Sequence, residues 1–158
     1  MLAFARLVVR MKPSTANQPP QHRSIYCTGC KTEVQARLTN GQERYPHRPD
    51  LYALPFWKCD TCGGYVGCHH KTKTPTEPLG YIATPEILEA RKKIHALLDP
   101  LWKSKRIKRG QAYAYIGHRL GYQYHTGEIK TVEEARQIYK IVAELHNKII
   151  TEATEVRT

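Results

Sequence analysis

The chain has 158 residues, of which 25 are basic and 14 acidic, so that it carries a net charge of +11. This length suits one domain, and no apolar stretch is long enough to cross a bilayer, which excludes an integral membrane protein and favours a cytoplasmic one. The excess of positive charge favours a polyanionic partner, for which nucleic acid is the first expectation and DNA is favoured over RNA.

Residues 1–24 are expected to form a flexible basic arm. They contain several prolines and polar residues, and too few regularly placed apolar groups to offset the entropy of ordering them. Because the arm contains arginine and no acidic residue, an organelle-targeting peptide is one interpretation of it. A true start at Met11 rather than Met1 is the other.

Two cysteine pairs of equal inner spacing, Cys27–Cys30 and Cys59–Cys62, lie in a region expected to span residues 25–70. Two residues between thiolates allow a tight turn to present both sulfurs to one ion, so the four cysteines predict one structural zinc ion. A disulfide is the alternative, but disulfides are typical of secreted chains. The first apolar run is interrupted by Arg6 before it reaches the length of a secretory signal.

The residues around the cysteine pairs follow the pattern of a small β-sheet. Apolar residues alternate with polar ones over residues 33–38, and Asn40-Gly41 predicts a hairpin turn. The 28 residues between Cys30 and Cys59 exceed the common spacing of a zinc ribbon, and an irregular excursion over residues 45–50 is expected to absorb the excess. So small a sheet is expected to depend on its metal for folding.

A connector over residues 71–83, interrupted by prolines, leads to a helical region over residues 84–150. Thr84 followed by Pro85 predicts the start of a first helix, whose apolar pattern Pro100 disturbs. A second helix is expected from Gly110 to Leu120, with Gly121 as its stop.

A capping box from Thr131 to Glu134 predicts the start of the third helix, and residues 151–158 are expected to fray. The predicted architecture is α+β, with a small zinc-ribbon-like β region followed by a three-helix region. Residues 25–150 are expected to form one compact unit.

The candidate nucleic-acid-binding residues lie between the first two predicted helices and at the start of the second. Cations there neutralise phosphates while tyrosine rings stack on bases, although a charge run between helices is also typical of a solvated loop. These candidates are Lys103, Lys105, Arg106, Lys108, Arg109 and Tyr113.

Cys68, His69, His95 and His125 are a second candidate cluster. They are interpreted as a second metal site, as a catalytic group in which an imidazole acts as general base, or as a core thiol with satisfied histidines. Replacement of a cysteine of the primary zinc site by Cys68 or His69 is a further interpretation. The catalytic interpretation makes a metal-dependent nuclease the alternative function. The few carboxylates before the helices argue against it, because they are not spaced like those of a magnesium nuclease.

The two cysteine pairs, Trp57, the run from Tyr65 to His69 and the run from Asp99 to Trp102 together resemble a family of small zinc-finger-containing proteins of bacteria and phages. The resemblance covers about residues 27–142. It implies a zinc ion and a bacterial or phage setting, without an established activity. The resulting hypothesis is a zinc-binding accessory factor that binds nucleic acid, with enzymatic activity less favoured and a protein-binding adaptor as the second alternative.

Overall fold

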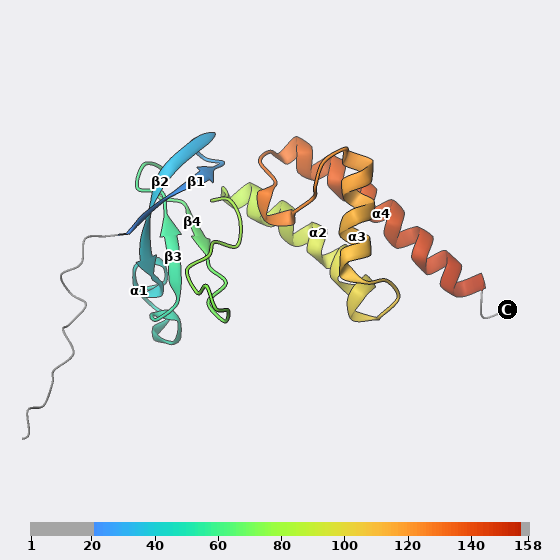
Figure 1. Cartoon of the computed structure of the whole chain (residues 1–158), viewed down its shortest axis with the longest axis horizontal. Helices are drawn as coiled ribbons and strands as arrows, with labels where there is room; N and C mark the ends of the chain where they lie inside the picture. The colour runs from blue at the N-terminus through green and yellow to red at the C-terminus, as the bar shows by residue number, and fades with distance from the viewer. Residues whose placement is uncertain (1–20, 156–158) are drawn as a thin grey trace, which may run out of the picture.

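The computed structural model describes residues 21–155 as an antiparallel sheet followed by helices (Figure 1). The sheet has the order β1-β2-β3-β4, and its strands are β1 (His22–Cys27), β2 (Thr32–Asn40), β3 (Pro55–Lys58) and β4 (Tyr65–Gly67). The main helices are α2 (Pro85–Lys103), α3 (Arg109–Leu120) and α4 (Val132–Glu155). The predicted α+β fold is therefore confirmed.

Two boundaries differ from those expected. Strand β1 begins at His22, so residues 22–24 of the predicted arm belong to the sheet, while residues 1–20 and 156–158 lie outside the described residues. Helix α4 continues through Thr151 to Glu155, where the sequence predicts a frayed tail. The hydroxyl of Thr151 donates to the carbonyl of Asn147 at 2.8 Å, one helical turn earlier.

The predicted hairpin turn at Asn40-Gly41 is wrong. Asn40 instead caps a short helix, α1 (Gly41–Arg44), because its side-chain oxygen accepts hydrogen bonds from two amides of the first turn at 3.0 and 3.3 Å. The chain then passes through a 3-10 turn, η2 (Pro49–Leu51), before β3 begins. Only glycine fits at position 41, since a Cβ there would lie 1.7 Å from the carbonyl oxygen of Leu51.

The described residues form two hydrophobic cores, one in the sheet and one among the helices. Trp57 is fully buried in the sheet core, and its indole nitrogen donates to the carbonyl of Thr76 at 2.7 Å, which ties the connector to the sheet. The helical core is made by side chains from α2, α3 and α4, with Leu98, Ile116 and Ile138 completely buried. Each half of the molecule thus excludes water on its own.

The end of the connector joins the two halves. Ile82 lies beside the end of β1, where its amide donates to Tyr26 at 3.0 Å and its carbonyl accepts from Thr28 at 2.9 Å. The buried hydroxyl of Thr28 accepts from the amide of Thr84, and the hydroxyl of Thr84 in turn caps the first turn of α2. The first cysteine pair and the start of α2 are therefore connected by consecutive hydrogen bonds.

The remaining helix ends follow local sequence signals. Helix α3 stops at Gly121, whose φ of 79° is left-handed. Half of the predicted capping box forms at α4, where the hydroxyl of Thr131 accepts from the amide of Glu134. The carboxylate of Glu134 accepts instead from the amide of Lys130. Helix α2 continues through Pro100 to Lys103, although the sequence predicts a disturbance there.

Candidate functional site

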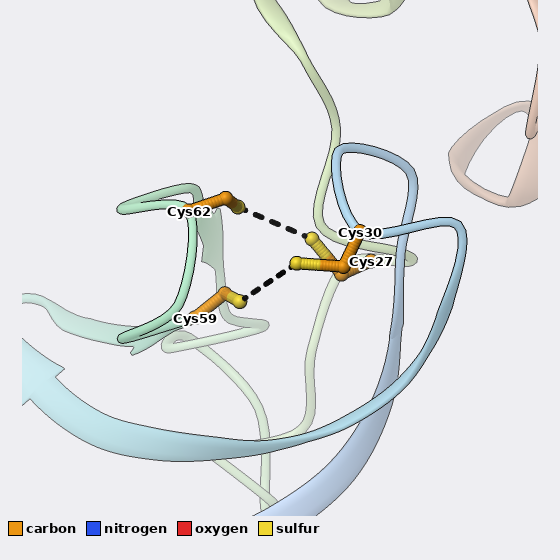
Figure 2. A group of neighbouring side chains, drawn as sticks. All are labelled: Cys27, Cys30, Cys59 and Cys62. Carbon is orange, nitrogen blue, oxygen red and sulfur yellow. Dashed lines mark hydrogen bonds between the residues drawn. The ribbon is translucent and has the colours of Figure 1, made fainter.

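The four sulfurs of the two cysteine pairs converge between the β1–β2 turn and the loop after β3 (Figure 2). The Sγ atoms of Cys27 and Cys62 lie 3.4 Å apart, those of Cys30 and Cys59 lie 3.7 Å apart, and all four fall within 4.8 Å of one another. Sulfurs bound at 2.3 Å in a tetrahedron lie about 3.8 Å from each other. The predicted ligand set therefore fits one zinc ion, held by Cys27, Cys30, Cys59 and Cys62.

The backbone around each pair favours the thiolate form that a metal needs. In each pair the first sulfur accepts hydrogen bonds from the backbone amides two and three residues later, those of Gly29 and Cys30 for Cys27 and those of Thr61 and Cys62 for Cys59. Burial raises the pKa of Cys27. At Cys59 burial also opposes ionisation, but the amides outweigh it and hold the pKa at about 7.

The two metal-binding turns share a backbone conformation that only one of them encodes with glycine. The residue after the second cysteine is left-handed in both, with φ of 57° at Lys31 and 76° at Gly63. A side chain in this conformation costs about 1 kcal/mol or more. Lys31 therefore carries backbone strain that the metal-binding turn imposes on it.

We expect Gly63→Ala to lower the free energy of unfolding of the zinc-loaded protein by about 1 kcal/mol. A Cβ at this position would meet no atom within 4 Å, so the loss comes from the backbone alone. Lys31→Gly is the matched control, since it relieves the same strain and leaves stability unchanged or slightly higher. Urea unfolding at saturating zinc measures the stability of both variants. Equal losses of unfolding free energy in the two would contradict the assignment of backbone strain to these positions.

The second candidate cluster is divided between two places. Cys68 is 4% exposed and lies in the sheet core, where burial raises the pKa of its thiol to about 11. His69, His95 and His125 instead line one cleft between the sheet and the helices. Within residues 21–155 the four zinc cysteines are the one group of three or more histidine, cysteine, aspartate or glutamate side chains whose ligand atoms converge.

Two of the three cleft histidines are oriented by hydrogen bonds. Nδ1 of His95 donates to the carboxylate of Asp99, one turn later in α2, at 2.9 Å. Nδ1 of His125 accepts from the amide of Gly127 at 3.1 Å, as the cap of the 3-10 turn η3 (Thr126–Glu128). These bonds fix both rings through Nδ1 and leave Nε2 of each ring for another partner.

The predicted basic residues lie at the junction of α2 and α3. Lys103 ends α2 and pairs with Asp99 at 3.6 Å, and Lys105 turns the loop with a φ of 60°. Lys105, Arg106 and Lys108 are exposed and have no carboxylate partner among the described residues. This set, with Lys103 and Arg109, is called the basic strip below.

Tyr113 lies next to the basic strip but is half-buried. Its ring packs against Trp102 and Tyr124 with centroid distances of 6.0 and 5.1 Å, and its hydroxyl accepts from the guanidinium of Arg109 at 3.3 Å. Arg109 also lies over the rings of Trp102 and Tyr113, at 5.4 and 5.2 Å. The contacts give Tyr113 the role of holding Arg109 in place.

Sequence reasoning missed two residues of this region. Arg44 ends α1 and lines the cleft from the sheet side, at 4.7 Å from the ring of Tyr65. Arg91 is 8% exposed and donates to the carbonyls of Tyr81 and Ile129 at 3.3 and 2.8 Å. Neither has a local signal, because their importance arises from segments that are distant in the sequence.

The family comparison agrees with this geometry. A family described as a zinc-finger-containing domain matches residues 23–147, which include the sheet except for the first residue of β1, all four zinc cysteines and most of the helical half. Comparison with curated proteins and with solved structures finds no match for the chain. In the described part of the chain, no helix has the length and apolar character needed to cross a membrane. The chain belongs to the zinc-finger-containing domain family.

Proposed function

We propose that this zinc-binding protein binds nucleic acid through the basic strip, as an accessory factor in bacterial or phage nucleic-acid transactions. The observation that carries the proposal is that exposed cations without a carboxylate partner lie next to one another in the strip, whereas four arginines elsewhere in the described chain are paired with carboxylates. Four arginines form ion pairs with N–O distances between 2.7 and 3.0 Å: Arg23, Arg37, Arg48 and Arg119. The strip's cations Lys105, Arg106 and Lys108 have no such partner among residues 21–155.

An exposed group of unpaired cations suits an external polyanion. Phosphate groups along a nucleic-acid backbone are spaced closely enough to meet several neighbouring cations at once, and each contact releases bound counterions. The family membership supports the same proposal, because many zinc-finger domains recognise nucleic acids. DNA is the expected partner ahead of RNA.

The test is the salt dependence of binding to a duplex DNA and to an RNA of the same length, measured by fluorescence anisotropy. The triple variant Lys105→Gln/Arg106→Gln/Lys108→Gln is expected to weaken duplex binding about tenfold or more. It should also reduce the log–log salt slope by about 2.7, since each lost phosphate contact contributes about 0.9. Undetectable or salt-independent binding of the wild type contradicts the proposal.

A second triple variant separates the position of the charges from their number. Arg136, Lys140 and Lys148 are exposed residues of α4, and no carboxylate lies within salt-bridge distance of them among the described side chains. Changing all three to glutamine removes the same net charge far along the chain from the strip. We expect this variant to retain most of the wild-type slope, and an equal loss in both triple variants would refute a localised site.

The geometry supports binding better than nuclease chemistry. The cleft that holds His69, His95 and His125 has no aspartate or glutamate among its lining residues, and carboxylates are the usual ligands of catalytic magnesium. Plasmid nicking with added zinc, magnesium or manganese tests the nuclease directly. Capture of a protein partner that survives nuclease treatment would favour the adaptor instead.

A further inference from the structure

A cleft of about 380 Å³ separates the sheet from the helical half, within the size range of small-molecule sites. Arg44, Tyr45 and Tyr65 line it from the sheet side. His95 on α2 and Arg109 on α3 are among the residues that line it from the helical side. The two walls thus come from segments far apart in the chain.

The lining of the cleft is positively charged and aromatic. It includes three arginines, three histidines and four tyrosines, with no carboxylate among its described lining residues: Arg44, Arg91, Arg109, His69, His95, His125, Tyr45, Tyr65, Tyr81 and Tyr113. A concave surface with charge of one sign focuses its field on the space inside. The expected occupant is therefore an anion.

Aromatic rings, rather than carboxylates, hold the two accessible guanidinium groups. Arg44 lies 4.7 Å from the ring centroid of Tyr65 and 5.2 Å from that of Tyr45, and it has no ion pair among the described residues. Arg109 lies over Trp102 and Tyr113 in the same way. Stacking on a ring face orients a guanidinium without neutralising it, so both keep their charge for a ligand.

The connector and η3 both line the cleft, and their backbones are in close contact there. A Cβ on Gly80 would lie 2.3 Å from the carbonyl oxygen of Gly127, and one on Gly127 would lie 2.5 Å from the carbonyl oxygen of Leu79. The amide of Tyr81 donates to the same Gly127 carbonyl at 2.8 Å. The two segments are thereby fixed against each other, which makes this part of the cleft rigid.

The sheet side of the cleft also offers an aromatic surface for a base. Tyr45 is 38% exposed, and its ring meets Phe56 edge-on at a centroid distance of 5.8 Å. Stacking of a base on such a ring adds binding affinity, and the gain depends little on which base it is. A phosphate and a base together are the two parts of a nucleotide, and the cleft presents cations and rings suited to both.

We propose that this cleft binds one unpaired nucleotide of a single-stranded nucleic acid, with its phosphate at Arg44 and Arg109 and its base against Tyr45. The inference rests on the proposed function and adds to it a preference for single strands. Arg109 connects the strip to the cleft, because it follows Lys108 directly in the strip and also lines the cleft. In a duplex both faces of a base are stacked and its pairing edge is occupied, so only an unpaired nucleotide can enter.

The experiment compares a labelled oligothymidine with a blunt duplex of the same length by fluorescence anisotropy. Arg44→Gln and Tyr45→Ala are each expected to weaken single-strand binding about tenfold and to leave duplex binding within about twofold. Tyr45→Phe retains the ring and should bind like the wild type. The control is Arg48→Gln, which removes an exposed arginine four residues from Arg44 that pairs with Asp50 and does not line the cleft.

The outcomes distinguish the two proposals. Duplex binding that the strip variant abolishes, together with wild-type single-strand binding by Arg44→Gln and Tyr45→Ala, overturns the cleft inference and leaves the proposed function standing. No binding to either oligonucleotide by the wild type overturns both. Free thymidine monophosphate that competes as well as the oligonucleotide overturns the single-strand assignment, and unchanged zinc content shows that each variant is folded.

Discussion

Removal of the metal is expected to unfold the sheet. Apparent binding free energies of structural zinc in small zinc-dependent folds are about 10–16 kcal/mol, and this energy is largely folding energy. The strands have between 3 and 9 residues, and two of the four zinc cysteines, Cys27 and Cys59, are part of the sheet core itself. Without the ion, four cysteines whose thiolates repel one another would remain clustered at the edge of this core, two of them buried in it.

The measurement is amide hydrogen exchange before and after chelation, together with zinc content. We expect one zinc ion per chain, loss of protection over β1 to β4 on chelation, and loss of both zinc and sheet protection in Cys59→Ser. Cys68→Ala is the control, because Cys68 lies in the same core without belonging to the metal site. Strands that stay protected after complete removal of zinc would contradict the prediction.

Arg91→Leu is expected to lower the free energy of unfolding by about 2 kcal/mol. The substitution leaves the carbonyls of Tyr81 and Ile129 without the donors they have at 3.3 and 2.8 Å, and hydrogen bonds from a charged group are worth about 1.5–3 kcal/mol each. Part of this loss is offset, because the buried guanidinium has no carboxylate partner in the described chain and its Nε is unpaired. Burial lowers the pKa of Arg91 to about 10, which reflects the same desolvation.

Chemical denaturation of the zinc-loaded protein measures the effect of Arg91→Leu. Lys92→Leu is the matched control, since Lys92 is the next residue in α2, is exposed, and is expected to change stability by less than about 0.5 kcal/mol. Zinc content should stay at one ion in both variants, because Arg91 lies outside the metal site. An Arg91→Leu variant as stable as the wild type would contradict the prediction. It would mean that the free-energy cost of desolvating the guanidinium cancels the free energy gained from its hydrogen bonds.

The parts of the fold that the sequence predicts correctly depend on local chemistry. The cysteine pairs specify their own ligand geometry, and Thr84 and Thr131 cap the helices that follow them. Asn40 shows the limit of this approach, because an Asn-Gly pair suits both a hairpin turn and a helix cap. The choice between them depends on the close contact between Gly41 and Leu51, which local sequence does not reveal.

The cleft was beyond sequence reasoning for a different reason. Arg44 and Arg109 are 65 positions apart, and no repeat or spacing relates them. Arg91 precedes two lysines in a helical pattern and has the appearance of a surface residue, although the structure buries it. Both facts depend on how the connector places the sheet against the helices, which is a property of the tertiary fold.

The chain of hydrogen bonds from Thr28 to Thr84 gives the metal an influence beyond the sheet. One wall of the cleft belongs to the zinc-dependent half, and the other belongs to helices with their own core. Under zinc starvation the protein would therefore keep its helical cations but lose the cleft that we propose to distinguish unpaired from paired nucleotides. The supply of zinc would then control the preference for single strands over duplexes, while the nonspecific attraction of the helical cations to polyanions would persist.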